Sequence, residues 1–138
     1  MQARVKWVEN VCFVGESETG HALVMDGAPE SGGRNLGMRP MELLLIGMGG
    51  CTSFDVVTIL KKGRQQITDC YVELKAERAE TVPKVFTKIH AHFVVTGRGL
   101  NPAQVERAIN LSAEKYCSAS LMLGKTAEIT HDFEIVEA

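Results

Sequence analysis

The sequence predicts an α+β fold with mainly antiparallel sheet. Three observations support this prediction: alternating apolar and polar segments toward both ends, one long apolar segment in the middle, and no regular alternation of strands with helices. Grouped strands and helices are typical of α+β proteins. With 138 residues, 45% of them apolar and 23% charged, the chain is expected to form a single domain over residues 1–138.

The first part of the chain is expected to form three short strands. Ala3, Val5 and Trp7 alternate with Arg4 and Lys6, which predicts a half-buried strand. The segments NVCFVG and HALVMDG predict two more strands, with ESETG as the turn between them. The following GAPESGGRNLGMRP is rich in Gly, Pro and polar residues, so a loop is expected there.

A long helix is predicted from Met41 to Leu60, with Pro40 at its first turn and KKG at its end. This segment is apolar on nearly every face, which is typical of a central, buried helix. The stretch GMGG at 47–50 places three glycines just before Cys51. Because a glycine within a helix costs about 1 kcal/mol relative to alanine, the stretch indicates that another backbone approaches the helix closely there, which would also leave room for a substrate beside Cys51.

The second half predicts a hairpin, a helix and a last strand. CYVELKAERA and KVFTKIHAHFVV both alternate, and AETVP joins them as an antiparallel hairpin. Asn101 is a suitable N-cap and Pro102 a suitable first residue for the next helix. The segment AEITHDFEIVE is the last strand. The buried stripe of the helix is expected to comprise Val105, Ala108, Ile109, Ser112 and Tyr116.

Charge and hydropathy predict a cytoplasmic protein with neither nucleic acid nor membrane as a partner. The net charge of −2 and the pI near 6.1 provide no strong attraction to anionic partners. No targeting segment is visible, and no uninterrupted run reaches the roughly 18 apolar residues of a membrane span.

The cysteines are the first candidates for chemistry. Cys12, Cys51, Cys70 and Cys117 form no CxxC pair, so neither a zinc site nor a thioredoxin-type site is predicted. Cys12 and Cys70 fall in strands, where a packing role is expected. Cys51 and Cys117 are 66 residues apart on different helices that pack in one small core, so the two thiols can meet. The alternative, that each is a small buried apolar side chain, stays open.

Other polar residues give weaker signals. His90 and His92 share the polar face of one strand, but no third metal ligand is evident, so a solvated face is favoured over a metal site. His131 lies on an apolar face, where a hydrogen-bonded core histidine is expected. Asp55 lies one turn after Cys51, where its charge would disfavour a thiolate if it were close.

Two motifs carry a family resemblance. RPMELLLIGMGGCTSFDVVTIL and, further on, EKYCSASLML resemble the OsmC/Ohr family, and the likeness covers essentially the whole chain. The resemblance implies an OsmC-like fold, in which sheets wrap around long central helices in an intertwined homodimer. It also implies thiol-dependent reduction of organic hydroperoxides with no metal or bound cofactor. Matching positions make Cys51 the peroxidatic thiol and Cys117 the resolving thiol, and a dithiol would be the electron donor.

The sequence departs from the peroxidases of this family at the charged positions. There, a glutamate directly after the proline holds an arginine from the first hairpin, whereas this chain has Met41 followed by Glu42 and no arginine in FVGESETGHALV. Arg39 or Arg34 in the loop is the candidate activator, with Glu42 orienting it. Nine helical residues from Glu42 to Cys51 turn by about 180°, onto the opposite face.

A second interpretation therefore stays open. Ser118 follows Cys117, where the family usually has proline, and the arginine–glutamate pair is not in its usual place. The chain would then form the same dimer without peroxidase activity. It would bind a small apolar molecule beside Cys51 or act as a redox-sensitive interaction protein.

Overall fold

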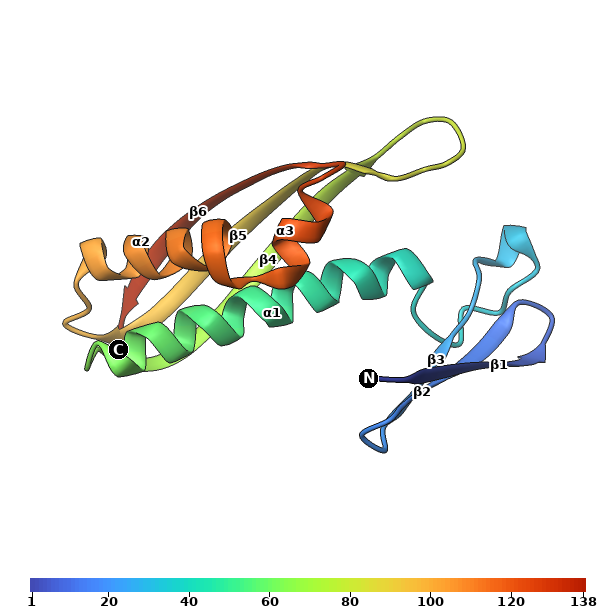
Figure 1. The fold of residues 1–138 in the computed structure, drawn as a ribbon, viewed down its shortest axis with the longest axis horizontal. Helices are drawn as coiled ribbons and strands as arrows, with labels where there is room; N and C mark the ends of the chain where they lie inside the picture. Colours follow the sequence, from blue (N-terminus) through green and yellow to red (C-terminus); the bar gives the residue numbers. More distant parts are fainter. The chain divides into compact units, whose positions relative to one another are not determined.

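The computed structural model describes every residue from Met1 to Ala138 and consists of two compact units, Met1–Leu44 and Leu45–Ala138. Each unit contains one three-stranded sheet (Figure 1). The order of elements is three strands, a long helix, a hairpin, a helical region and a last strand. This order confirms the predicted α+β class.

The unit Met1–Leu44 is built on an antiparallel sheet in the order β1-β2-β3. Its strands are β1 (Ala3–Glu9), β2 (Cys12–Ser17) and β3 (Ala22–Met25), and a short 3₁₀ helix, Pro29–Ser31, lies in the loop that follows. Gly20 has a φ of +90° in the turn between β2 and β3, a conformation that glycine adopts without strain. Every residue of β1 is exposed, so the prediction of a half-buried strand is wrong within this chain.

The long helix α1 spans Pro40–Lys62 and buries one stripe of residues. Met48, Thr52, Val56 and Leu60 recur at intervals of four on that stripe. The prediction of a helix buried all round is wrong within this chain, because Phe54 on another face is 71% exposed.

The three glycines of α1 have different surroundings. A Cβ at Gly49 would lie 2.7 Å from Leu74 Cδ1 and 3.4 Å from Val72 Cγ1, so two side chains, and not the predicted backbone, approach the helix closely there. A Cβ at Gly47 or Gly50 would meet nothing within 4 Å. These two glycines therefore leave the helix surface open.

The sheet of the unit Leu45–Ala138 has the order β4-β5-β6. The antiparallel hairpin of β4 (Gln66–Arg78) and β5 (Phe86–Arg98) is confirmed. The last strand, β6 (Glu128–Glu137), pairs in parallel with β5, so the prediction of antiparallel sheet is wrong at this pair. The intervening helices form a crossover that returns the chain to the end of the sheet where β5 began.

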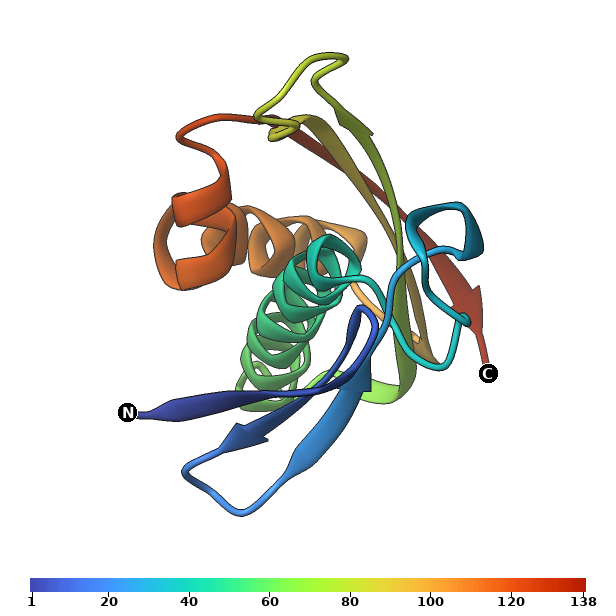
Figure 2. The same ribbon diagram turned by 90° about the vertical axis from the view of Figure 1, so that its right-hand side faces the viewer.

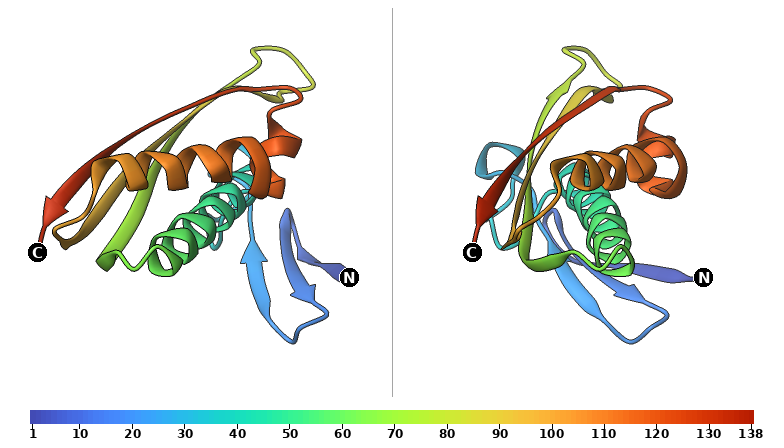
Figure 3. Two further views of the ribbon diagram at one scale, coloured as in Figure 1. Left: turned by 60° about the vertical axis from the view of Figure 1, so that its left-hand side comes forward. Right: turned by 90° about the vertical axis from the view of Figure 1, so that its left-hand side faces the viewer.

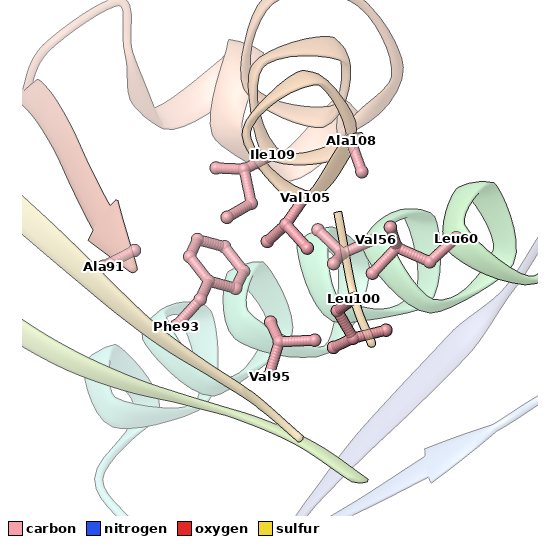
Figure 4. Packing of buried hydrophobic residues seen from close by; sticks show 9 residues of the cluster. All are labelled: Val56, Leu60, Ala91, Phe93, Val95, Leu100, Val105, Ala108 and Ile109. Atoms are coloured by element: carbon pink, nitrogen blue, oxygen red, sulfur yellow. The ribbon is translucent and has the colours of Figure 1, made fainter. Parts of the chain in front are cut away.

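Two helices cover one face of this sheet. Figures 2 and 3 show α1 and α2 (Pro102–Leu111) on the same side of β4-β5-β6. Asn101 accepts a hydrogen bond from the Ala103 N–H at 2.9 Å, which confirms it as the N-cap. Figure 4 shows the buried apolar cluster, whose members are Val56, Leu60, Ala91, Phe93, Val95, Leu100, Val105, Ala108 and Ile109. Burying each of the larger side chains contributes about 1.5–3 kcal/mol.

By length and composition, α1 is long and apolar enough to cross a membrane. It has 23 residues and contains a window of mean hydropathy 1.8, of which 28% is buried. This corrects the expectation from the sequence, which considered only uninterrupted apolar runs. Core helices of globular proteins have the same composition, and Val56 and Leu60 of α1 belong to the core cluster.

Candidate active site around Cys51 and Cys117

The two candidate thiols lie beside each other although they come from distant segments. Cys51 lies in the middle of α1 and is partly exposed. Cys117 is completely buried, and its Sγ lies 4.0 Å from the Met48 carbonyl oxygen, three residues before Cys51. Burial raises the pKa of the Cys117 thiol, and the neighbouring Cys51 thiol raises it further. The structure therefore brings together an accessible thiol and a buried one.

Ser120 is the polar partner of Cys117. Its hydroxyl donates to Cys117 Sγ at 3.0 Å, and its backbone N–H donates to the same sulfur at 3.3 Å. Both hydrogen bonds lower the pKa of Cys117 and so oppose the effect of burial. Sequence reasoning missed Ser120, because Cys117 acts as the N-cap of α3 and cysteine is not among the residues usually found at that position.

A short π-helical turn, Ser112–Tyr116, places Cys117 at this point. Cys117 itself is extended, with φ −76° and ψ 99°, and α3 (Ser118–Leu123) follows it, so the prediction that Cys117 lies within a helix is wrong. The Cys117 N–H donates to the Ser112 carbonyl at 2.8 Å. The wider turn rotates Tyr116 away from the buried face, and its side chain is 50% exposed. The prediction that Tyr116 belongs to the buried stripe is therefore wrong. Val105, Ala108, Ile109 and Ser112 are confirmed as buried.

The Asp55 carboxylate accepts a hydrogen bond from Ser112. The Ser112 hydroxyl donates to Asp55 Oδ2 at 2.9 Å and also lies 2.8 Å from Thr52 Oγ1. Ser112 is fully buried and Thr52 is 3% exposed. The Asp55 carboxylate is thus paired, and it joins α1 to the segment that carries Cys117.

The candidate activating residues have partners within the unit Met1–Leu44. The Arg34 guanidinium pairs with Glu9. Arg39 Nη1 donates to Asn35 Oδ1 at 2.9 Å, and the Arg39 N–H donates to Glu42 Oε1 at 2.8 Å. Glu42 therefore caps the start of α1 and contacts the main chain of Arg39. An approach of Arg34, Arg39 or Glu42 to Cys51 stays a prediction.

Asp26 organises the loop that carries these arginines. Its carboxylate is 2% exposed and accepts backbone N–H bonds from Gly27 at 2.8 Å and from Arg34 and Leu36, both at 3.1 Å. The hydrogen bond from Leu36 is the largest cause that lowers the pKa of Asp26. Sequence reasoning missed this residue; the Asp-Gly pair at the start of the loop is the signal that could have found it.

The histidines of β5 form a cluster with β6. His90 Nε2 and His92 Nδ1 lie 2.9 and 2.7 Å from Asp132 Oδ1, and His90 Nδ1 lies 2.7 Å from Thr130 Oγ1. No group of three or more His, Cys, Asp or Glu side chains has an arrangement suited to a metal ion. His131 is partly buried on the apolar face of β6.

The other two cysteines, Cys12 and Cys70, lie in strands and are buried or partly buried. Cys12 is 7% exposed at the start of β2. Cys70 lies on β4, packs against the core cluster, and has a raised pKa because of burial. Both positions confirm the expected packing role.

Comparison with known proteins identifies the family. A family model described as OsmC-like protein matches residues 32–132. The chain belongs to the OsmC-like family. It is 55% identical to protein YhfA of Escherichia coli K12 over 138 residues, which is 100% of both chains. The family resemblance read from the two cysteine motifs is thereby confirmed.

Solved structures share the fold of this OsmC-like protein. A hypothetical protein from Aquifex aeolicus VF5 is 29% identical and has a TM-score of 0.87, covering 99% of this chain and 96% of that one. An organic hydroperoxide resistance protein OsmC from Legionella pneumophila is 18% identical, with a TM-score of 0.74 over 96% of this chain and 95% of its own. The second likeness concerns the fold alone.

Proposed function

We propose that this OsmC-like protein reduces organic hydroperoxides, with Cys51 as the peroxidatic thiol and Cys117 as the resolving thiol. The observation that supports the proposal is the pairing of a partly exposed thiol with a buried one beside it. A partly exposed thiol is accessible to a peroxide substrate, and a buried thiol beside it can react with the sulfenic acid that forms. The function assigned to the Legionella relative is consistent with this chemistry.

The reaction is expected to proceed in three steps. The Cys51 thiolate attacks the terminal peroxide oxygen, the O–O bond breaks, and the alkoxide leaves and takes up a proton to become the alcohol, so that Cys51 becomes a sulfenic acid. Cys117 then attacks that sulfur, a disulfide forms, and water leaves. A dithiol donor reduces the disulfide and is itself oxidised to a disulfide. No step requires a metal or a bound cofactor.

We assign thiolate activation to Arg39 or Arg34. A thiol with an unperturbed pKa near 8.5 is only about 3% ionised at pH 7, so a nearby cation speeds the first step. The contact between the Arg39 N–H and Glu42 supports a role for Glu42 in fixing the Arg39 backbone. The loop that carries both arginines is anchored by three backbone N–H groups, of Gly27, Arg34 and Leu36, that donate to the Asp26 carboxylate.

We further propose that one OsmC-like domain, residues 1–138, acts as a cytoplasmic homodimer. Ile46 and Phe54 on α1 are 50% and 71% exposed, and Trp7 on β1 is 58% exposed. Large apolar side chains exposed on a helix and a sheet are typical of surfaces that associate. A second copy of the chain is the partner implied by the family resemblance.

Cumene hydroperoxide consumption with dithiothreitol as the donor tests the proposed activity. We expect Cys51→Ser to reduce the rate to background and Cys117→Ser to leave a Cys51 sulfenic acid that dimedone traps. Cys70→Ser, which changes another partly buried thiol, is the matched control and should retain turnover. Equal rates in the wild type and in Cys51→Ser, or no trapped sulfenic acid under excess peroxide, would rule the function out.

A groove favours a second candidate function, binding of a small apolar ligand without turnover. It lies between α1 and α2, and its apolar lining comprises Phe54, Ile59, Leu60, Leu111 and Tyr116. Phe54 is three residues after Cys51 on α1. Saturable binding of an apolar fluorescent probe that Phe54→Ala weakens and Cys51→Ser leaves unchanged, together with no peroxide turnover, would support this function.

A further inference from the structure

The environments of the two sulfurs differ in a way that determines how their disulfide is reduced. Cys117 Sγ receives the Ser120 hydroxyl at 3.0 Å and the Ser120 N–H at 3.3 Å, and Ser120 itself is 6% exposed. Cys51 has the Cys117 thiol as its polar neighbour, and it receives neither of the Ser120 donors. Only the Cys117 sulfur is therefore surrounded by donors suited to a negative charge.

The two sulfurs also differ in their accessibility to an external thiol, and this difference favours attack at Cys51. Cys51 is partly exposed, whereas Cys117 has no exposed surface. A thiolate attacks a disulfide at one sulfur, so it needs access to that sulfur, and the other sulfur departs with the electron pair. An external thiol reaches Cys51 without opening the structure, whereas reaching the fully buried Cys117 requires the surrounding residues to move.

We propose that a reducing thiol attacks Sγ of Cys51 and that Cys117 departs as a thiolate stabilised by Ser120. This inference rests on the proposed Cys51–Cys117 disulfide. A bond forms between the donor sulfur and Cys51, the Cys51–Cys117 bond breaks, and its electron pair stays on Cys117. The donor sulfur is oxidised and Cys117 is reduced. A second donor thiol then releases Cys51, and the Cys117 thiolate takes up a proton.

Ser120 is the catalytic residue of this step, because it contacts the departing sulfur. Burial alone raises the pKa of Cys117 and makes it a poor leaving group, whereas the Ser120 hydroxyl acts against burial. Removing that hydroxyl should slow disulfide cleavage by roughly three- to tenfold, since one charge-assisted hydrogen bond is lost while the thiolate charge is only partly developed. The backbone N–H of residue 120 would remain in place.

The site of attack can be identified directly. The full-length protein is oxidised with diamide, treated briefly with cysteamine, quenched with acid, and its free thiols are alkylated before peptide mapping by mass spectrometry. We expect the cysteamine adduct on Cys51 and the alkyl group on Cys117. An adduct mainly on Cys117, or an equal distribution, would overturn the inference.

The role of Ser120 is tested by the rate of disulfide reduction under dithiothreitol. Ser120→Ala should slow reduction by the factor above, and Ser120→Thr should restore part of the rate because it retains a hydroxyl. Ser118→Ala removes an exposed hydroxyl two residues earlier and is the matched control, with an unchanged rate expected. An unchanged rate in Ser120→Ala, with the same circular dichroism as the wild type, would refute the role of Ser120.

The outcomes also separate this inference from the proposed peroxidase function. Diamide forms the disulfide without any peroxide, so the site of attack is measured even when cumene hydroperoxide is not consumed. Attack on Cys117 with normal peroxide turnover would refute only the inference. If diamide produces no Cys51–Cys117 disulfide, the inference fails together with the resolving role of Cys117.

Discussion

At the scale of single residues, Ser112 connects the two segments that carry the thiols. Its hydroxyl contacts Thr52 Oγ1 at 2.8 Å and donates to Asp55 Oδ2 at 2.9 Å, both on α1. Its carbonyl accepts the Cys117 N–H at 2.8 Å. Since Ser112 is fully buried, water cannot replace these partners. The position of Cys117 relative to α1 therefore depends on a serine that takes no part in the chemistry.

Ser112→Ala is expected to lower the free energy of unfolding by about 1–3 kcal/mol, because it leaves the Asp55 carboxylate without its buried donor. Urea denaturation followed by circular dichroism measures this change, and Ser118→Ala, at an exposed position, is the control. We also expect Ser112→Ala to slow formation of the Cys51–Cys117 disulfide. A variant as stable as the wild type would show that the hydrogen bond to Asp55 contributes nothing net.

The sequence was sufficient to single out Cys51 and Cys117 but not the residues that contact them. Two cysteines expected on helices of one small core predict a pair, although Cys117 lies just before α3, and the motif resemblance assigns them roles. Ser120 and Ser112 act through a local backbone geometry, the π-helical turn, which no apolar periodicity reveals. The same limit applies to Asp26, since its carboxylate accepts N–H groups as far as ten residues away.

At the scale of elements, a strand or helix was predictable where the residues within that segment determine it. The β4–β5 hairpin and the N-cap at Asn101 follow from alternation and capping alone. The parallel pairing of β6 was not predictable, because it depends on where the crossover helices deliver the chain. The prediction for Tyr116 was wrong because it assumed a helix of constant period, which would place Tyr116 on the buried face. The wider π-helical turn at Ser112–Tyr116 rotates the residue away from that face.

The parallel pair β5–β6 carries a titratable cluster on its polar side. Asp132 contacts His90 and His92, and Glu134 Oε2 lies 3.9 Å from His92 Nε2. The hydrogen bond to Asp132 is the largest cause that raises the pKa of His92 above 6.5, and charges from Asp132, Glu134 and Glu73 add to it. The bond from His92 likewise lowers the pKa of Asp132. The ion pair between protonated His92 and the Asp132 carboxylate is therefore favoured at pH values between the lowered pKa of Asp132 and the raised pKa of His92.

Asp132→Asn is expected to lower the pKa of His92 toward 6.5, because the largest cause of the increase is removed. A folded-state pKa above the unfolded value stabilises the protein fully below pH 6.5, and this contribution disappears as the pH rises through the folded value. An NMR titration of the imidazole resonances measures the shift. Glu128→Gln, on the same strand, is the control, and an unchanged His92 midpoint in Asp132→Asn would contradict the assignment.

At the scale of the whole molecule, α1 has two opposite faces with different surroundings. Met48, Thr52 and Val56 are buried, whereas Gly50 and Phe54, offset by two residues and so by about 200°, are exposed. A helix in a complete structure seldom leaves so apolar a face uncovered. The sequence predicted burial on all sides, and a second copy of the chain would supply the cover that one chain lacks.

Gly50→Leu distinguishes an open helix face from a dimer contact. A Cβ at Gly50 meets nothing within 4 Å in a single chain, so the substitution should stabilise an isolated helix by roughly 1 kcal/mol. If two copies of α1 cross at this glycine, the larger side chain separates them. We therefore expect dissociation to monomers in sedimentation velocity, with at least a tenfold weaker dimer. Ala103→Leu, an enlargement at an exposed position of α2, should leave the dimer intact. An intact and more stable Gly50→Leu dimer would place the interface on another surface.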